Sequence, residues 1–96
     1  MAKSHAKGSE MVLAVCDEEL LGKVFEDGSI VLDLKRYKAF YDGKKVSEEE
    51  LLALASLATS INAVGSGALV LAKRGICDEK NIRYIKGVPH IQIYKL

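Results

Sequence analysis

The sequence predicts a small α+β domain of two layers, in which about five mainly antiparallel strands carry two helices on one face. A capped, uncharged stretch over residues 47–74 is typical of two helices that meet at a glycine-rich joint. Short apolar runs bounded by turn residues precede and follow this stretch, and such segregation of strands and helices along a chain is typical of α+β folds. The length of 96 residues, 49% of them hydrophobic, suffices for one domain.

Apart from Met1, the first ten residues are small or polar, so we expect residues 1–10 to form a flexible tail before a single domain over residues 11–96. They lack the apolar core of a signal peptide. Cys16 and Cys77 lie far apart with no further cysteine beside either, which excludes a disulfide framework and a cysteine metal motif. We therefore expect a cytoplasmic protein with reduced thiols, no metal and no cofactor.

Four segments outside the helical stretch predict the strands. Residues 11–16 form a continuous apolar run, which is typical of a strand covered on both faces. Asp17 is then expected to cap a helical turn that Gly22 ends. Residues 23–26 and 30–34 flank an Asp-Gly hairpin signal, and residues 81–85 and 90–94 predict two further strands joined by residues 86–89.

The helical stretch begins at a capping box, because Ser47 precedes Glu50 by three residues and an apolar run follows. Gly75 is placed to end the second helix in a left-handed conformation. The buried stripe of the first helix is predicted to consist of Leu51, Leu54, Ala55, Ala58 and Ile61, at helical spacing.

No Asp, Glu, Lys or Arg occurs from Leu51 to Ala72. Polar residues interrupt the middle of this run, where lipid would leave them unpaired, so we expect no membrane span. A helix without charge on any face is typical of burial on more than one side, and the second surface can come from another copy of the protein. This predicts a homodimer whose interface includes Ala53, Ser56, Thr59 and Ser60.

The joint between the two helices allows two interpretations. Gly65, Ser66 and Gly67 open the second helix, and amides at such a position can bind an anion. The pattern lacks the Gly-Lys-Ser/Thr ending of a phosphate loop, so the alternative is a tight joint in which glycine permits close approach and Ser66 caps the helix.

Residues 35–45 contain five of the fourteen basic residues and three of the six aromatic residues. Basic side chains neutralise phosphates and aromatic rings stack on unpaired bases, so we expect a noncatalytic binding module for RNA or a ribonucleoprotein such as the translation machinery. The alternative is a hairpin arm that turns at Asp42-Gly43, with aromatic rings in the core and lysines in solvent. The residues assigned to RNA binding are Lys35, Arg36, Tyr37, Lys38, Tyr41, Lys44, Lys45, Arg83, Lys86 and His90.

Two other functions remain as alternatives, and no catalytic residue is assigned. The first is the homo-oligomeric interaction subunit that the uncharged helices predict. The second is a small enzyme that uses His90, the one histidine in a predicted element. That enzyme requires His90 to lie in a concave pocket with Asn62 or Cys77 within hydrogen-bonding distance.

Four segments together resemble a small, mostly archaeal family known as domain of unknown function 424. They are Cys-Asp-Glu-Glu-Leu-Leu-Gly-Lys at 16–23, Val-Ser-Glu-Glu-Glu-Leu at 46–51, Asn-Ala-Val-Gly at 62–65 and Gly-Val-Pro-His-Ile-Gln at 87–92. The resemblance extends over nearly all of residues 11–94. It implies a compact α+β domain and an archaeal cytosolic source, and it implies no activity.

The chain departs from the family pattern at two places. The resemblance leads us to expect a basic residue soon after Gly65, where this chain has Ser66 and Gly67, and this weakens a phosphate-binding role for the joint. It also leads us to expect charged residues scattered through the helices, which are absent here. The second departure favours the oligomer.

Overall fold

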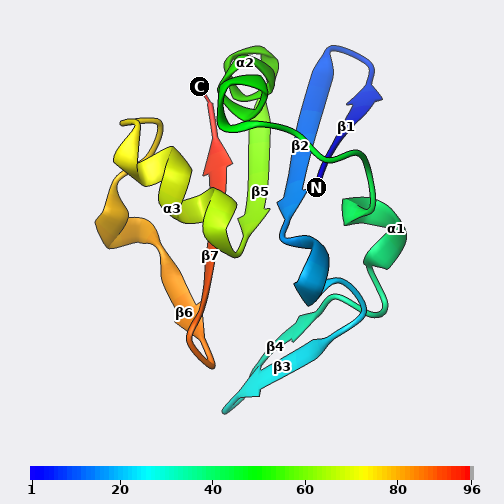
Figure 1. Cartoon of the computed structure of the whole chain (residues 1–96), viewed down its shortest axis with the longest axis vertical. Helices are drawn as coiled ribbons and strands as arrows, with labels where there is room; N and C mark the ends of the chain where they lie inside the picture. Colours follow the sequence, from blue (N-terminus) through cyan, green and yellow to red (C-terminus); the bar gives the residue numbers. More distant parts are fainter. Residues whose placement is uncertain (96) are drawn as a thin grey trace.

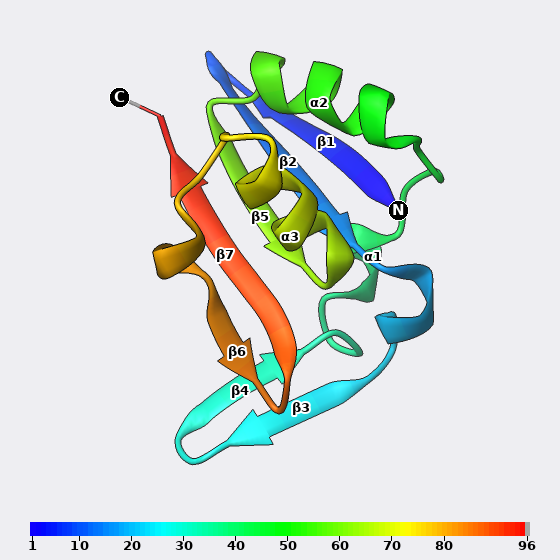
Figure 2. The same cartoon turned by 60° about the vertical axis from the view of Figure 1, so that its left-hand side comes forward.

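A computed structural model describes residues 1–95 and shows a five-stranded mixed sheet, with strands in the order β1-β2-β5-β7-β6 (Figure 1). The strands are β1 (Ala2–Lys7), β2 (Glu10–Cys16), β5 (Ser60–Val64), β6 (Arg83–Ile85) and β7 (Val88–Tyr94). Two helices, α2 (Glu48–Leu57) and α3 (Ser66–Lys73), lie over one face of this sheet (Figure 2). The predicted α+β domain with helices on one face is confirmed.

The opposite face of the sheet is only partly covered. A separate hairpin of β3 (Val24–Asp27) and β4 (Ile30–Asp33), together with the short helix α1 (Lys38–Tyr41), lies against it. Two single 3₁₀ turns, η1 (Glu18–Leu20) and η2 (Glu79–Asn81), complete the chain. No helix in the part of the chain that the structure describes has the length and apolar character needed to cross a bilayer.

Strand alternation divides the core into two apolar clusters, one on each side of the sheet. On the helix side, Leu13 and Val15 of β2 pack with Leu51 and Leu71 of the helices. On the hairpin side, Ala14, Cys16 and Val64 of the sheet pack with side chains of the hairpin and α1, namely Leu32, Leu34 and Tyr41. We call these the helix face and the hairpin face.

The first predicted helix is too long, because Ser60–Val64 forms strand β5 in the centre of the sheet. Helix α2 ends at Leu57, and Ala58 is already extended with ψ 145°. β5 pairs in parallel with β2 and antiparallel with β7, so its backbone groups are paired on both sides. Burial of β5 inside the chain accounts for part of the uncharged stretch, whereas Leu57 of α2 and Leu69 of α3 are exposed.

The prediction of a flexible tail is wrong for Ala2–Lys7, which forms edge strand β1. Its small and polar side chains give no apolar pattern, and the backbone ladder to β2, from Ala2↔Val15 to Lys7↔Glu10, supplies the pairing instead. On the outer side, the amide of Ala2 donates to Lys44 O at 2.9 Å, and the amide of Lys44 donates to Ala2 O at 3.1 Å.

The alternative prediction of a hairpin arm over residues 35–45 is also wrong. Asp33 Oδ1 accepts from the amides of Lys35 and Arg36 at 3.2 and 2.8 Å, and this turn leads into α1. Lys3 Nζ donates to Ala39 O, and His5 Nε2 donates to Phe40 O, so β1 satisfies carbonyls at the end of α1. The His5 ring stacks on Phe40 with centroids 4.5 Å apart.

The helix N-termini are capped in two different ways. The capping box is confirmed, because the amide of Glu50 donates to Ser47 Oγ and the amide of Ser47 donates to Glu50 Oε1. Asp17 does not cap its own turn η1. Its carboxylate instead accepts from the amide of Ser66 at 2.8 Å and from Ser66 Oγ, and so caps α3 from another part of the chain.

Gly65 makes this cap possible. Its φ of +90° and ψ of −149° belong to a region that side chains rarely adopt, and a Cβ there would collide with the Asp17 carboxylate. We expect Gly65→Ala to lower the free energy of unfolding by roughly 3 kcal/mol, from backbone strain and the displaced cap, as measured by urea denaturation.

Gly28→Ala is the matched control for this substitution. Gly28 also has a positive φ, +63°, but an added Cβ there would have no atom within 4 Å beyond its chain neighbours. We expect it to cost about 1 kcal/mol from the backbone alone. Equal losses in the two variants would show that the collision with Asp17 does not matter.

Candidate functional site

Four polar side chains form the floor of the candidate site on the hairpin face. Asn62 in β5 lies opposite Gln92 in β7, and His90 in β7 lies opposite Arg83 in β6. Side chains directly opposite each other in an antiparallel pair share one face and lie about 5 Å apart at Cβ. The register of three strands therefore gathers these residues into one patch.

Two adjoining cavities open above this floor. One has a volume of about 350 Å³ and includes Arg83, Asn81 and Ile85 in its lining, and we call it the arginine cavity. The other has a volume of about 310 Å³ and includes Tyr37, Phe40 and Tyr41, and we call it the aromatic cavity. Both cavities share Val31, Leu32, His90 and Gln92.

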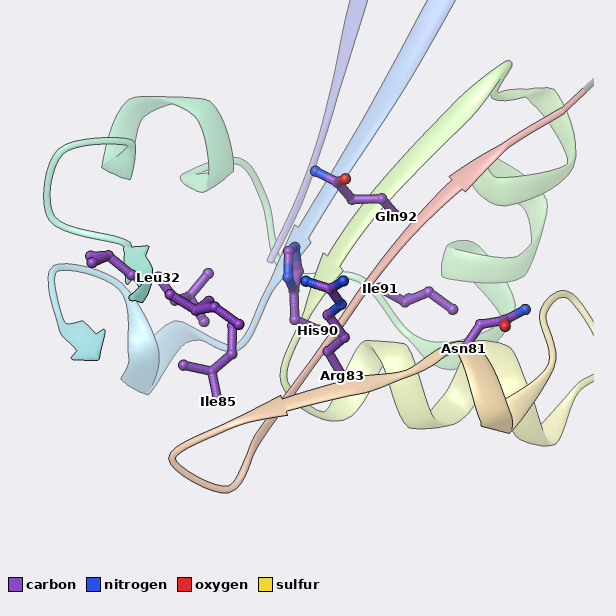
Figure 3. A pocket seen from close by; sticks show the side chains of 9 residues that line it. Leu32, Asn81, Arg83, Ile85, His90, Ile91 and Gln92 are labelled. Atoms are coloured by element: carbon purple, nitrogen blue, oxygen red, sulfur yellow. The ribbon is translucent and has the colours of Figure 1, made fainter. Parts of the chain in front are cut away.

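Figure 3 shows the arginine cavity from close by. His90 and Arg83 lie side by side on β7 and β6, as their register requires, and Gln92 lies farther along β7. Leu32 and Ile85 form an apolar side of the cavity. A flat or charged group that enters this cavity would meet polar atoms on the sheet and aliphatic carbon from Leu32 in the hairpin and Ile85 in β6.

A hydrogen-bonded chain connects α1 to the sheet floor. Tyr41 Oη donates to Asn62 Oδ1 at 3.0 Å, and His90 Nε2 lies 3.0 Å from the same oxygen. An amide oxygen only accepts, so His90 Nε2 carries the proton and Nδ1 of the neutral ring is an acceptor. Asn62 therefore fixes both the rotation and the tautomer of His90.

Burial controls the protonation of this chain. Desolvation, followed by the positive charge of Arg83, lowers the pKa of His90, so the imidazole is neutral at pH 7. Desolvation, with a smaller contribution from Cys16, raises the pKa of Tyr41 to about 12. Burial also raises the pKa of Cys16 to about 11, so neither the Tyr41 phenol nor the Cys16 thiol is an anion at neutral pH.

The structure brings four of the predicted RNA-binding residues together. Tyr37 and Tyr41 line the aromatic cavity, Arg83 lines the arginine cavity, and His90 lines both. Tyr37 is 53% exposed, and the guanidinium of Arg36 lies 5.6 Å from its ring centroid. Lys35, Arg36 and Lys38 flank this tyrosine in the chain and are exposed.

The remaining three predicted RNA-binding residues lie away from the cavities. The backbone of Lys44 pairs with Ala2 at the sheet edge, and Lys45 forms a surface ion pair with Glu18 at 2.9 Å. Lys86 is at the β6–β7 turn, where its φ of 52° fits a two-residue hairpin loop. None of the three lines the arginine or the aromatic cavity.

The predicted interface residues belong to helix α2, the connection that follows it and strand β5. Ala53 and Ser56 are exposed on α2, and the hydroxyl of Ser56 donates to Ala53 O. Thr59 Oγ1 accepts from the amide of Met11 and donates to Met11 O, at 2.9 and 3.0 Å, and so joins the connection after α2 to β2. Ser60 belongs to β5 and is half-buried. The homodimer stays a prediction.

At the predicted anion-binding residues, Gly65, Ser66 and Gly67, the protein supplies its own anion. The Asp17 carboxylate occupies the amide and hydroxyl of Ser66. Gly67 lies against Val15, whose Cγ1 would be 2.6 Å from an added Cβ, so this glycine permits close packing of α3 on β2. No group of three or more metal-ligating side chains occurs among residues 1–95.

The residues assigned to RNA binding from the sequence include neither Gln92 nor the apolar residues that line the cavities. Gln92 alternates with Ile91 and Ile93 in β7, which places it on the same face as His90, and this alternation was a usable signal. No local signal places Val31 and Leu32 beside His90, because the hairpin reaches the sheet through tertiary packing alone.

The family model described as "Protein of unknown function (DUF424)" matches residues 5–96. The chain belongs to this family. The DUF424 chain is also similar to a crystal structure of an uncharacterized conserved protein from the archaeon Methanopyrus kandleri. The two are 30% identical, with a TM-score of 0.81, over 99% of this chain and 90% of the other. A comparison with curated proteins finds no match.

The geometric requirement for an enzyme that uses His90 is met in this DUF424 chain, because His90 borders two cavities and hydrogen-bonds to Asn62. Cys77 does not contribute. It packs with the cluster on the helix face, whereas the side chain of His90 lies on the hairpin face. In the same hydrogen-bonded chain, burial raises the pKa of Tyr41 to about 12, so this phenol stays protonated at neutral pH.

The lowered pKa of His90 makes the stability of the DUF424 chain depend on pH. The unfolded imidazole binds protons at a higher pH than the folded one, so the stabilisation is present above the usual pKa of 6.5 and is lost as pH falls below it. We expect His90→Gln to reduce this acid loss in urea denaturation between about pH 7.5 and 5.5. His5→Gln is the control and should retain it.

The shared acceptor at Asn62 gives a second expectation. Asn62→Leu leaves the Tyr41 hydroxyl and His90 Nε2 without their acceptor, and each unpaired donor costs about 1–3 kcal/mol. We expect a loss of roughly 2 kcal/mol or more by urea denaturation. Gln92→Leu, at the exposed cross-strand partner, should change stability by less than about 0.5 kcal/mol. Similar losses of stability in the two variants would contradict the role of Asn62 as the shared acceptor.

Proposed function

We propose that this protein is a noncatalytic module that binds single-stranded RNA, free or within a ribonucleoprotein, through the hairpin face. The observation that supports this most strongly is the placement of Tyr37, His90 and Arg83 around adjoining cavities on one partly covered sheet face. Proteins that bind unpaired RNA combine aromatic surfaces for bases with cations for phosphates. Both kinds of group meet here.

The charge around the cavities supports an anionic partner. Arg83 has no carboxylate within ion-pairing distance among residues 1–95, so its charge is available to a ligand. Asp33 is the acidic residue in the cavity linings, and its Oδ1 accepts from two backbone amides. Lys35, Arg36 and Lys38 add positive charge beside Tyr37.

A base in the aromatic cavity would meet side chains already held in place. Tyr41 is buried and hydrogen-bonded, and Asn62 fixes His90. Preorganised polar groups lose little conformational entropy on binding, which favours affinity. The proposed RNA-binding surface excludes Lys44 and Lys45 of the predicted basic segment, because these two residues lie away from the cavities.

We also infer a cytoplasmic location, in which the free thiols of Cys16 and Cys77 persist.

The phosphate contacts can be tested with fluorescence anisotropy of a labelled single-stranded RNA. We expect Lys35→Ala/Lys38→Ala to weaken binding roughly fivefold at low salt and to reduce the dependence of log affinity on log salt by about 0.7 for each lost contact. The matched control is Lys73→Ala/Arg74→Ala, which removes the same charge from the end of α3 over the helix face.

The control variant should bind RNA with nearly the wild-type affinity and salt dependence. Equal losses in the two variants would mean that general charge, rather than the hairpin face, attracts RNA. If the wild-type protein fails to bind single-stranded RNA at low salt, the RNA proposal is wrong.

A further inference from the structure

The two cavities differ in chemistry although they share one border. Tyr37, Phe40 and Tyr41 supply rings to the aromatic cavity, and Arg83 with Asn81 supplies polar groups to the arginine cavity. His90 and Gln92 belong to both linings, so the two spaces adjoin along β7. One ligand with a flat apolar part and an anionic part can therefore occupy both.

The aromatic cavity suits a planar ring system. The Phe40 and Tyr41 rings meet edge to face with centroids 5.0 Å apart, and the His5 ring stacks on Phe40 from β1, so these rings are held in position. Arg36 lies over the Tyr37 ring, which leaves one ring face for stacking. Any nucleobase can stack on such a ring, whatever the identity of the base.

The border between the cavities offers a hydrogen-bond acceptor. Because His90 Nε2 donates to Asn62, Nδ1 is the acceptor of the neutral ring, and no hydrogen bond to Nδ1 is present among residues 1–95. Nucleobases carry exocyclic amine or ring N–H donors on their edges. A base in the aromatic cavity can thus donate to His90 while its phosphate extends toward Arg83.

The arginine cavity suits the phosphate. A guanidinium presents N–H donors in a planar fork that matches phosphate oxygens, and these charge-assisted bonds are stronger than neutral ones. Asp33 lines the aromatic cavity but not the arginine cavity, so no carboxylate opposes a phosphate at Arg83 in the lining of that cavity.

We propose that the paired cavities bind one nucleotide unit, with the base against Tyr37 and Tyr41, a base donor on His90 Nδ1 and the phosphate on Arg83. This deepens the proposed function and rests on it for the source of the nucleotide. The same chemistry is present in an unpaired nucleotide within RNA and in a free mononucleotide.

The orientation is tested by NMR titration of the labelled protein with AMP, adenosine and inorganic phosphate. We expect AMP to shift the signals of Tyr37, Asn62, His90 and Arg83. Arg83→Gln should weaken AMP about tenfold and leave adenosine within about twofold, because only the phosphate contact is lost. Tyr37→Ala should weaken both AMP and adenosine about tenfold, because stacking is lost.

Tyr84→Ala is the matched control for Tyr37→Ala. Tyr84 is 54% exposed and follows Arg83 in β6, so alternation places it on the opposite side of that strand. It should leave AMP binding unchanged. The inference is overturned if AMP shifts no cavity signal at millimolar concentration, or if Arg83→Gln weakens AMP and adenosine equally.

Anisotropy with RNA separates the two sources and the two proposals. If an unpaired nucleotide in RNA is the ligand, single-stranded RNA binds at least about tenfold tighter than AMP, and AMP displaces it. If AMP binds the cavities and RNA does not bind at all, the nucleotide inference stands and the RNA function falls. If RNA binds equally to wild type, Tyr37→Ala and Arg83→Gln but more weakly to Lys35→Ala/Lys38→Ala, RNA binding at the hairpin face stands and the nucleotide inference falls.

Discussion

The double pairing of β5 is the constraint on which the rest of the structure depends. This strand forms a parallel ladder with β2 on one side and an antiparallel ladder with β7 on the other. Every residue of β5 therefore has one defined face, with Ile61 and Ala63 toward the helices and Asn62 and Val64 toward the hairpin. A one-residue slip would exchange these faces and bury Asn62 under the helices.

The polar residue Asn62 in β5 also explains why the hairpin face contains cavities. An amide in the middle of a sheet must be hydrogen-bonded, and Asn62 Oδ1 is satisfied from one side by α1 and from the other by β7. The hairpin β3–β4 buries Leu32 against this face without extending across all of it. Because Asn62 and His90 of the floor are hydrogen-bonded to each other and the hairpin covers only part of the floor, cavities remain above it.

The parts of the fold that could be predicted from the sequence have local chemical signals. The capping box at Ser47, the Asp-Gly turn between β3 and β4, and the last two strands are examples. β5 was missed because a short apolar run fits helix and strand equally, and the neighbours that decide between them are distant in the chain. The Asp17 cap was missed for the same reason, since its partner lies 49 residues away. His90, Arg83, Tyr37 and Tyr41 could be named from residue type, but their common location depends on strand register and on packing of α1.

The mixed order of the sheet has a consequence for folding during synthesis. β5 is made before β7, and until β7 follows, the edge of β5 that pairs Ile61 with Ile93 has no partner. An unpaired apolar edge is a template for other chains, and long-range pairing is slow to form. The centre of this sheet is therefore completed by its final strand, so a nascent chain whose β7 has not yet left the ribosome is the species most exposed to aggregation and to chaperones.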